Sequence, residues 1–430
     1  MLIDAHCHFF TNSILADRLK KDAKSLLRLS KKLTGEPSHP ALRGAACFLT
    51  TGIENTPEEM YEYMKGGYGC DFIAVPLMLD LTYAFLSPEQ KSRNDSTIIK
   101  ALDSMKASSL PVKHLENLEK RIDTFERSVL GIDVFQNSYQ KQINDLTAIK
   151  EKMPDRVFPF FSVDPRRYDE FEGGILSEIK KYVGKNKPFL GVKLYSSLGY
   201  SPTHPVLFDN SKGQSVYGYC ERHNIPITVH SSIEGFSHFL DKTRIIGDVY
   251  YPEAGKCVPA ESLYESGIVK YTNNIPSINF EEITRERLIL LNHPIIWRKV
   301  LEKYPNLKID LAHFGGVIQS YKYAVNDKSS FWTEYIIDML NDFPNVYTDL
   351  SCFYEQDNNP DYMKVIYKNL YKKLSKKARQ KVMFGSDYYM LALYNTTPKD
   401  YITSFREAFK NDFYKISEEN PSKFLDIKVY

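Results

Sequence analysis

Two histidines separated by a single residue stand near the start of the sequence, in "DAHCH" at residues 4–8. Side chains alternate between the two faces of a β-strand, so His6 and His8 would point the same way if this segment is extended. Their Cα atoms would then lie roughly 6.5–7 Å apart, which lets both imidazoles reach one metal ion. An HxH pair is also compatible with surface or packing histidines, so its chemistry depends on what the fold brings beside it.

Further residues with metal-binding or proton-transfer chemistry stand at or near the ends of apolar runs elsewhere in the chain. Imidazoles and a carboxylate make a nitrogen and oxygen ligand set that suits Zn²⁺ and, less distinctively, Mn²⁺, Fe²⁺ or Co²⁺. The pattern therefore predicts a divalent metal site if these run ends meet. The residues are Lys193 in "GVKLY", His230 in "TVHSS", His313 in "LAHFGG" and Asp387 in "FGSD".

Eight short apolar runs recur along the chain, and most are separated by segments with helical periodicity. Eight strands that alternate with helices favour an α/β fold, a closed (β/α)8 TIM barrel, over an open sheet. In such a barrel the carboxyl ends of all strands meet at one mouth, which would bring the polar run ends together. The runs are "LIDAHCH" and residues 70–79, 157–165, 189–196, 225–232, 307–316, 345–352 and 381–387.

Two connections between these runs, at about residues 80–156 and 233–306, are too long for simple crossovers. Long insertions in a barrel usually decorate its catalytic face, so we expect both of them there. No internal repeat, low-complexity tract or shift of composition marks a second domain. We therefore predict one barrel domain over residues 1–430.

The composition excludes several classes of partner. The 56 basic and 54 acidic residues leave a formal charge of +2, which gives no reason to expect nucleic acid or a membrane surface. No stretch approaches the roughly 18–20 apolar residues of a membrane-spanning helix, and the first residues do not have the pattern of a signal peptide. The six cysteines are scattered without CxxC pairing, which favours free thiols. We expect a cytoplasmic protein that acts on a small molecule.

The motifs together resemble the amidohydrolase superfamily, and more specifically its amidohydrolase-related branch. That branch includes metal-dependent hydrolases, lactonases and enzymes of the aminocarboxymuconate-semialdehyde decarboxylase type. The resemblance extends in scattered blocks from residue 2 to about residue 426, and the two insertions match no pattern. The blocks are "DAHCH", "VHSS", "HPIIWRKVLEKYPNLKIDLAHFGG", "FGSDYY" and "ENPSKFL".

The resemblance implies a role for each strand-end residue. Asp387 would act as general base on a water molecule activated by the metal. His313 would face the substrate, either as a proton donor or as a group that polarises the substrate's carbonyl oxygen. Lys193 would be a carboxylated bridge between two metals, with His313 as a ligand, or else a cationic anchor for the substrate. One metal is usual in this branch. The residues that would hold it are His6, His8, His230 and Asp387.

Five further residues are candidates for substrate contact. Arg166 and Arg167 follow the third run and would bind a substrate carboxylate, although surface ion pairs are the simpler alternative. His238 follows the fifth run, where a surface loop histidine is the alternative. Tyr388 and Tyr389 come directly after Asp387 and would line the pocket.

The expected activity is hydrolysis, in which a metal-activated water attacks an amide, ester or lactone carbonyl of a small molecule. A nonoxidative decarboxylase or a hydratase would use the same residues and is the nearest alternative. A noncatalytic barrel that only binds a small molecule is the third alternative. It predicts that one of the metal-binding residues is missing, and none of them is missing from the sequence. The resemblance implies a homodimer, although no residue of this sequence directly indicates one.

Overall fold

The computed structural model describes residues 1–9, 55–85, 138–209, 215–235, 245–251, 255–259, 291–327, 331–354, 361–388, 390–394 and 396–428. Within these ranges, each of the eight predicted runs contains one parallel strand, which confirms the predicted strand series. The strands are β1 (Leu2–Cys7), β2 (Phe72–Pro76), β3 (Phe160–Ser162), β4 (Gly191–Leu194), β5 (Ile227–Ser232), β8 (Ile309–Gly315), β9 (Val346–Asp349) and β10 (Val382–Met383).

The eight strands close into a ring. Six of them pair in the order β10-β9-β8-β5-β4-β3, and β1 pairs with β2. Parallel bridges from Ala74 to Val157 and from Leu77 to Phe160 join β2 to the chain around β3. A parallel bridge between Cys7 and Tyr388 joins β1 to the segment after β10. Every neighbour around the ring is therefore connected, as the predicted (β/α)8 barrel requires.

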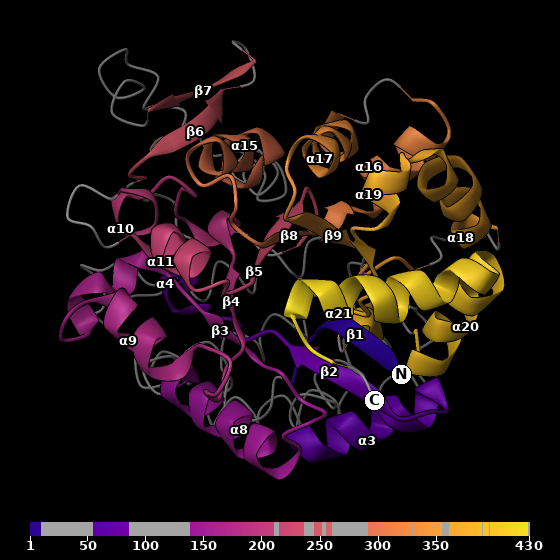
Figure 1. Cartoon of the computed structure of the whole chain (residues 1–430), viewed down its shortest axis with the longest axis horizontal. Helices are drawn as coiled ribbons and strands as arrows, with labels where there is room; N and C mark the ends of the chain where they lie inside the picture. The colour runs from indigo at the N-terminus through magenta and orange to yellow at the C-terminus, as the bar shows by residue number, and fades with distance from the viewer. Residues whose placement is uncertain are drawn as a thin grey trace, which may run out of the picture.

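Helices surround the strands, and the indigo first strand lies beside the yellow C-terminal helices (Figure 1). The helix before β2 begins with a capping box, in which the Thr56 side chain accepts from Glu59 N and the Glu59 side chain accepts from Thr56 N. The longer outer helices are α3 (Pro57–Tyr68), α8 (Ser138–Lys152), α9 (Ile175–Tyr182), α11 (Val216–Arg222), α15 (Pro294–Lys303), α16 (Val317–Ala324), α17 (Phe331–Asp342) and α20 (Pro398–Phe409).

Shorter helices complete the layer. They are α4 (Thr82–Phe85), α10 (Pro205–Phe208), α18 (Tyr362–Val365), α19 (Lys376–Arg379) and α21 (Asn420–Leu425). No helix among the described residues has the length and apolar character needed to cross a membrane.

Two apolar clusters hold the layers together. The larger one packs the strands against the outer helices. The smaller one gathers side chains such as Ile3, Ile73 and Met383 from several barrel strands and packs them against Phe424 of α21. Helix α21 passes over this end of the barrel (Figure 1). Polar chemistry is therefore confined to the opposite end, where the strands finish.

The two predicted insertions are described only in part. Helix α8 ends the first, and the second contains the antiparallel pair β6 (Asp248–Tyr251) and β7 (Lys256–Pro259) followed by α15. The segment "SPEQ" at residues 87–90, whose sequence is typical of a helix start, lies outside the described residues. The placement of both insertions on the catalytic face remains a prediction.

Close packing inside the barrel gives a direct test of the fold. A Cβ added at Gly191 of β4 would lie 2.5 Å from the Pro226 carbonyl oxygen and 2.6 Å from Phe160 Cζ. We expect Gly191→Ala to lower the free energy of unfolding by about 1–3 kcal/mol, because the surrounding core must shift. Gly66→Ala is the control, since a Cβ there meets nothing within 4 Å. Equal melting temperatures for the two variants would contradict the packing.

Candidate metal centre

His6 and His8 at the end of β1 converge on one carboxylate. His8 Nε2 lies 2.9 Å and His6 Nε2 lies 3.4 Å from Asp387 Oδ1. All three side chains are buried. The pairing of β1 with β2 shifts register between Asp4 and Cys7, and such an irregularity can re-aim side chains at the end of a strand. The structure thus brings together three of the four residues predicted to hold the metal.

Barrel closure places the carboxylate. Asp387 follows β10 and has a φ of 58°, a left-handed conformation that is uncommon for this residue type. Its backbone N–H and that of Ser386 both donate to the His6 carbonyl oxygen, at 2.7 and 3.0 Å. The hydrogen bonds that join the first strand to the last therefore fix Asp387 beside the histidines.

The outer ring nitrogens of both histidines are bonded to protein groups. His6 Nδ1 lies 2.8 Å from Asp349 Oδ2, and His8 Nδ1 lies 2.8 Å from the Leu77 carbonyl oxygen. Because these acceptors place a ring proton on Nδ1 of both histidines, Nε2 is the atom of each ring that can ligate a metal. His6 Nε2 is buried and has no hydrogen-bond partner. Histidines that bind metal commonly donate the outer ring N–H to a protein acceptor in this way, so these residues fit a divalent ion.

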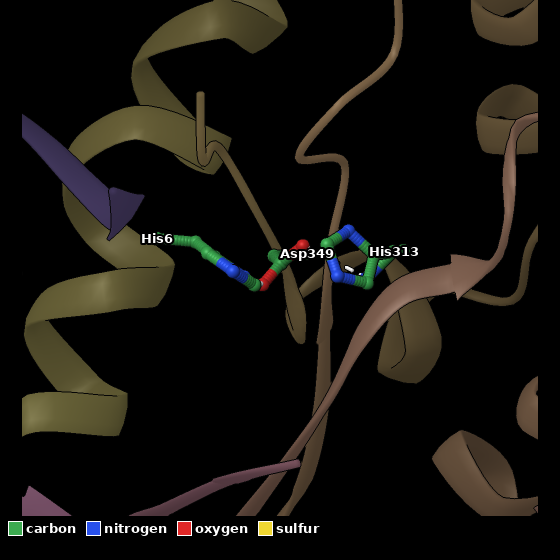
Figure 2. Close-up of side chains that lie close together, drawn as sticks. All are labelled: His6, His313 and Asp349. Carbon is green, nitrogen blue, oxygen red and sulfur yellow. Dashed lines mark hydrogen bonds and ion pairs between the residues drawn. The ribbon is translucent and has the colours of Figure 1, made fainter. Parts of the chain in front are cut away.

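Asp349, at the end of β9, connects this centre to His313 (Figure 2). Its Oδ1 accepts from the backbone N–H groups of His313 and Ser351, each at 3.0 Å, and from the Ser351 hydroxyl. The Ser351 Oγ also lies 3.1 Å from His6 Nδ1 and 2.9 Å from His313 Nδ1. His6, His313 and Asp349 form a second possible metal group. Because the Ser351 hydroxyl already bonds to all three, we assign the metal to the His6, His8 and Asp387 group.

A strained turn aims His313 at the cavity. Four consecutive residues, from His313 to Gly316, have φ values of 68°, 51°, 86° and 105°. Such conformations are costly for His313 and Phe314 and persist where the surroundings impose them, often at functional sites. A Cβ at Gly316 would meet the Glu234 carboxylate, so the turn also needs glycine there. The His313 ring centroid lies 4.7 Å from those of both His6 and His230.

His230 stands on the other side of His313 and belongs to neither metal group. Its Nε2 lies 2.7 Å from the Glu234 carbonyl oxygen, and its ring stacks on Tyr195 at 4.1 Å between centroids. The Nε2 proton donates to that carbonyl, so the lone pair resides on Nδ1. The role of His230 as a metal ligand remains a prediction, with Nδ1 as the ligating atom.

Electrostatics favour neutral His8 and His313 and an ionised Asp387, whereas they favour the protonated form of His6. Burial lowers the pKa of His8 and lowers that of His313 to about 4. Burial alone would raise the pKa of Asp387, but its interactions with His6 and His8 hold that pKa well below its ordinary value. For His6, burial and the Lys193 charge oppose protonation, and Asp349 and Asp387 together still raise its pKa. A metal cation at Nε2 would take the place of that proton.

Lys193 lies in the cavity wall and is 1% exposed. Burial lowers its pKa to about 8, although Asp349, Asp387 and Asp310 oppose this shift. Among the described residues, Nζ forms no hydrogen bond or ion pair, and it lies 5.8 Å from the Tyr195 ring centroid. A buried ammonium without a protein partner is suited to a ligand oxygen.

The centre opens into a cavity of about 670 Å³, its mouth included. Lys193 is the only lysine or arginine among the described lining residues. Tyr354 and Tyr394 stack at 3.8 Å on the wall, and the Cys352 thiol lies beside Asp387. The wall is mainly apolar, as in most small-molecule sites. Its apolar and aromatic lining includes Leu79, Tyr195, Val317, Tyr354, Met390 and Tyr394.

The other predicted contact residues are placed elsewhere or lie outside the described chain. Arg166 pairs with Asp164, and Arg167 pairs with Asp80 and Glu170. Neither arginine lines the cavity, so both serve internal ion pairs. Tyr388 is buried at the bridge to Cys7 and also does not line the cavity. His238 and Tyr389 lie outside the described residues.

Sequence reasoning did not identify Asp349, Ser351 and Glu234. A signal existed for the first, because Asp349 ends the seventh apolar run as Asp387 ends the eighth. Ser351 and Glu234 act through local bonds in the turns after β9 and β5. Serine and glutamate are too common in such turns to stand out.

The sequence profile of the family described as Amidohydrolase matches residues 3–427. No curated protein sequence matches the chain. Among solved structures, 2,6-dihydroxybenzoate decarboxylase with its benzoate aligns at 12% identity and a TM-score of 0.45, covering 99% of both chains. A probable 2-pyrone-4,6-dicarboxylic acid hydrolase from Acinetobacter baumannii aligns at 12% identity and a TM-score of 0.47, and the alignment also covers 99% of both chains.

A third similar structure is 5-carboxyvanillate decarboxylase from Novosphingobium aromaticivorans, complexed with manganese and 4-hydroxy-3-methoxy-5-nitrobenzoic acid. It aligns at 13% identity and a TM-score of 0.47, covering 99% of this chain and 96% of that one. Because these identities and TM-scores are low, family membership rests on the profile match alone.

The bond between Asp349 and His6 predicts an effect on metal affinity. We expect Asp349→Asn to weaken zinc binding by about 10–100-fold, because the amide is a poorer acceptor for His6 Nδ1 and cannot accept all the surrounding donors. Competition with a chromogenic chelator measures the dissociation constant. The exposed Asp338→Asn of α17 is the control. Unchanged affinity in Asp349→Asn would contradict the outer-shell role.

Proposed function

The chain belongs to the amidohydrolase family, and from this premise we propose that it is a metal-dependent hydrolase that attacks an amide, ester or lactone carbonyl of a small molecule. The observation that carries the proposal is the convergence of His6 and His8 Nε2 on Asp387 Oδ1, with both outer nitrogens bonded elsewhere. Histidine nitrogens and a carboxylate suit zinc best, with manganese, iron or cobalt as alternatives.

We propose one metal, held by His6, His8 and Asp387, with His230 as the fourth ligand. When bound, such a metal lowers the pKa of a water molecule so that it can attack a carbonyl near neutral pH. A second metal would require a carboxylated Lys193 and His313 as a ligand. Against that arrangement, the His313 Nδ1 is already bonded to Ser351.

The protein groups divide the proton transfers between them. Asp387 is ionised and buried beside the two histidines, so it would accept the proton of the attacking water as general base. His313 Nδ1 bonds to Ser351, which leaves Nε2 as an acceptor toward the cavity. Once Asp387 has accepted that proton, His313 would receive it at Nε2 and deliver it to the leaving group. In its protonated form it would also polarise the substrate carbonyl.

Lys193 would orient the substrate. With a pKa of about 8 it is mostly protonated at pH 7, and within the described chain its ammonium has no hydrogen-bonding partner. An oxygen of the substrate would supply that partner, while the apolar and tyrosine wall packs against the rest of the molecule.

A decarboxylase or hydratase is the second candidate, since the same centre and the same ammonium would hold a substrate carboxylate. A noncatalytic barrel is disfavoured, because no expected side chain is missing. We also propose a cytoplasmic location, which the free state of the five described cysteines supports. A homodimer remains an expectation from the resemblance to the family.

Metal content tests the proposal directly. We expect about one zinc or manganese per chain in protein purified without a polyhistidine tag, and none in the His6→Ala/His8→Ala double variant. His223→Ala, on an exposed histidine, should keep the metal. Chelation should abolish hydrolysis of ester, lactone and amide probes, and zinc should restore it. Release of carbon dioxide from a carboxylic acid probe, without hydrolysis of the other probes, would contradict the hydrolase proposal and favour the decarboxylase.

Removal of the Lys193 charge should separate substrate binding from metal binding. We expect Lys193→Met to weaken binding of an anionic probe such as benzoate by about tenfold or more, because a charge-assisted hydrogen bond is lost. Zinc content should be unchanged, and binding of neutral benzamide should change little. Calorimetry measures both probes. A carbamate carbon signal in wild-type protein supplied with labelled bicarbonate would instead make Lys193 a metal bridge.

A further inference from the structure

The carboxyl group of Asp4 is buried beside the metal centre and takes no part in the proposed proton transfers. Asp4 lies on β1, two residues before His6, and its side chain is 0% exposed. Its bonding partners are hydroxyl and backbone N–H groups, and no lysine or arginine of the described structure is among them. A buried carboxyl group is costly unless its oxygens are hydrogen-bonded, so these partners indicate what it does.

Both oxygens of Asp4 accept hydrogen bonds, and the donors come from three parts of the chain. Oδ1 accepts from the backbone N–H groups of Ser386 and His6, at 2.9 and 3.2 Å. Oδ2 accepts from the hydroxyl groups of Ser386 and Tyr68, at 2.6 and 2.7 Å. The Asp4 side chain therefore joins β1 to the segment after β10 and to the last residue of α3.

These bonds hold the chain on both sides of Asp387. Ser386 comes directly before Asp387 and gives both its N–H and its hydroxyl to Asp4. The Ser386 Oγ in turn accepts from the N–H of Tyr388, directly after Asp387, at 2.9 Å. The left-handed φ of 58° at Asp387 is costly and persists only where the surroundings impose it. Asp4 lies at the centre of the bonds that impose it.

The geometry points to Asp4 as a positioning residue that holds the Asp387 carboxylate against the two histidines. One part of its hydrogen-bond network fixes the backbone of His6, and another fixes the turn that presents Asp387. Each Asp4 oxygen already accepts two hydrogen bonds, so Asp4 acts through its neighbours and does not itself bind the metal. The consequence for metal affinity rests on the proposed function, whereas the effect on the Asp387 turn does not.

Two tyrosines of α3 provide a matched test. Tyr68→Phe removes one hydrogen bond to Asp4 and leaves every residue of the centre in place. Tyr61→Phe is the control, because the Tyr61 hydroxyl is also buried and donates to the Phe72 carbonyl oxygen at 2.9 Å. We expect the dissociation constant for zinc to rise about threefold or more in Tyr68→Phe and to stay unchanged in Tyr61→Phe.

Two substitutions of Asp4 itself test the bonds to the backbone. Asp4→Asn keeps an oxygen that can accept from the two N–H groups, and Asp4→Ala keeps none. We expect zinc affinity to fall about tenfold or more in Asp4→Ala and clearly less in Asp4→Asn.

The cobalt(II) form supplies a spectroscopic measurement that general destabilisation does not change. We expect the visible absorption spectrum of Asp4→Ala to differ from that of wild type, because Asp387 is displaced from the metal. Gly191→Ala disturbs the core at Pro226 and Phe160 and should keep the wild-type spectrum.

Hydrogen exchange of the metal-free protein tests the turn without metal or turnover. We expect residues 384–388 to exchange about threefold faster in Tyr68→Phe than in Tyr61→Phe, because the bonds that hold this segment are weakened. Strand β8 is the internal reference and should exchange equally in both variants. The tyrosine variants keep Asp4, so a folding failure of Asp4→Ala does not affect this measurement.

The outcomes are distinct. Equal zinc affinities in the two tyrosine variants would overturn the proposal, as would a wild-type cobalt spectrum in Asp4→Ala. A loss of affinity in Asp4→Asn as large as that in Asp4→Ala would overturn the role of the bonds to the backbone. If wild-type protein binds no metal at all, the proposed function fails, and the exchange of residues 384–388 still decides whether Asp4 holds the Asp387 turn.

Discussion

The buried negative charge of Asp349 is the constraint on which the rest of the centre depends. A carboxylate removed from water is tolerated only when its oxygens are fully hydrogen-bonded. Here the required donors come from the end of β8, the turn after β9 and the ring of His6. The same bonds that stabilise the charge therefore orient His6, and through Ser351 they also orient His313. Satisfying one buried charge positions both a metal ligand and a proton-transfer residue.

Barrel closure supplies the second half of the centre. The His6 carbonyl accepts from the backbone N–H groups after β10, so the last strand cannot pair with the first without bringing Asp387 to the histidines. Residues 6 and 387 are remote in sequence, and the ring of parallel strands is what makes them neighbours. At the opposite end the apolar cluster under α21 closes the barrel, which leaves a single polar mouth.

The sequence alone predicted most of the fold because strand-length apolar runs and helix caps are local signals. The strand around Lys193 depends on neighbouring residues and was found as expected, and the capping box at Thr56 is likewise set by neighbouring residues. Long-range pairing is not visible in a sequence. The structure pairs Arg167 with Asp80, which lies 87 residues away, and the role of Arg167 in substrate binding stays a prediction. Asp349 ends an apolar run just as Asp387 does, but its bond to His6, which is 343 residues distant, could not be predicted from the sequence.

The central claim is that His6, His8 and Asp387 hold a single metal ion. Diffraction from crystals of the zinc-loaded protein, with anomalous data at the zinc edge, tests it most directly. The account predicts one anomalous peak per chain, about 2.0–2.2 Å from the Nε2 atoms of both histidines and from an Asp387 oxygen. A peak bonded to His313 Nδ1 and Asp349 instead, or a centre that stays empty while zinc binds only at the surface, would contradict it.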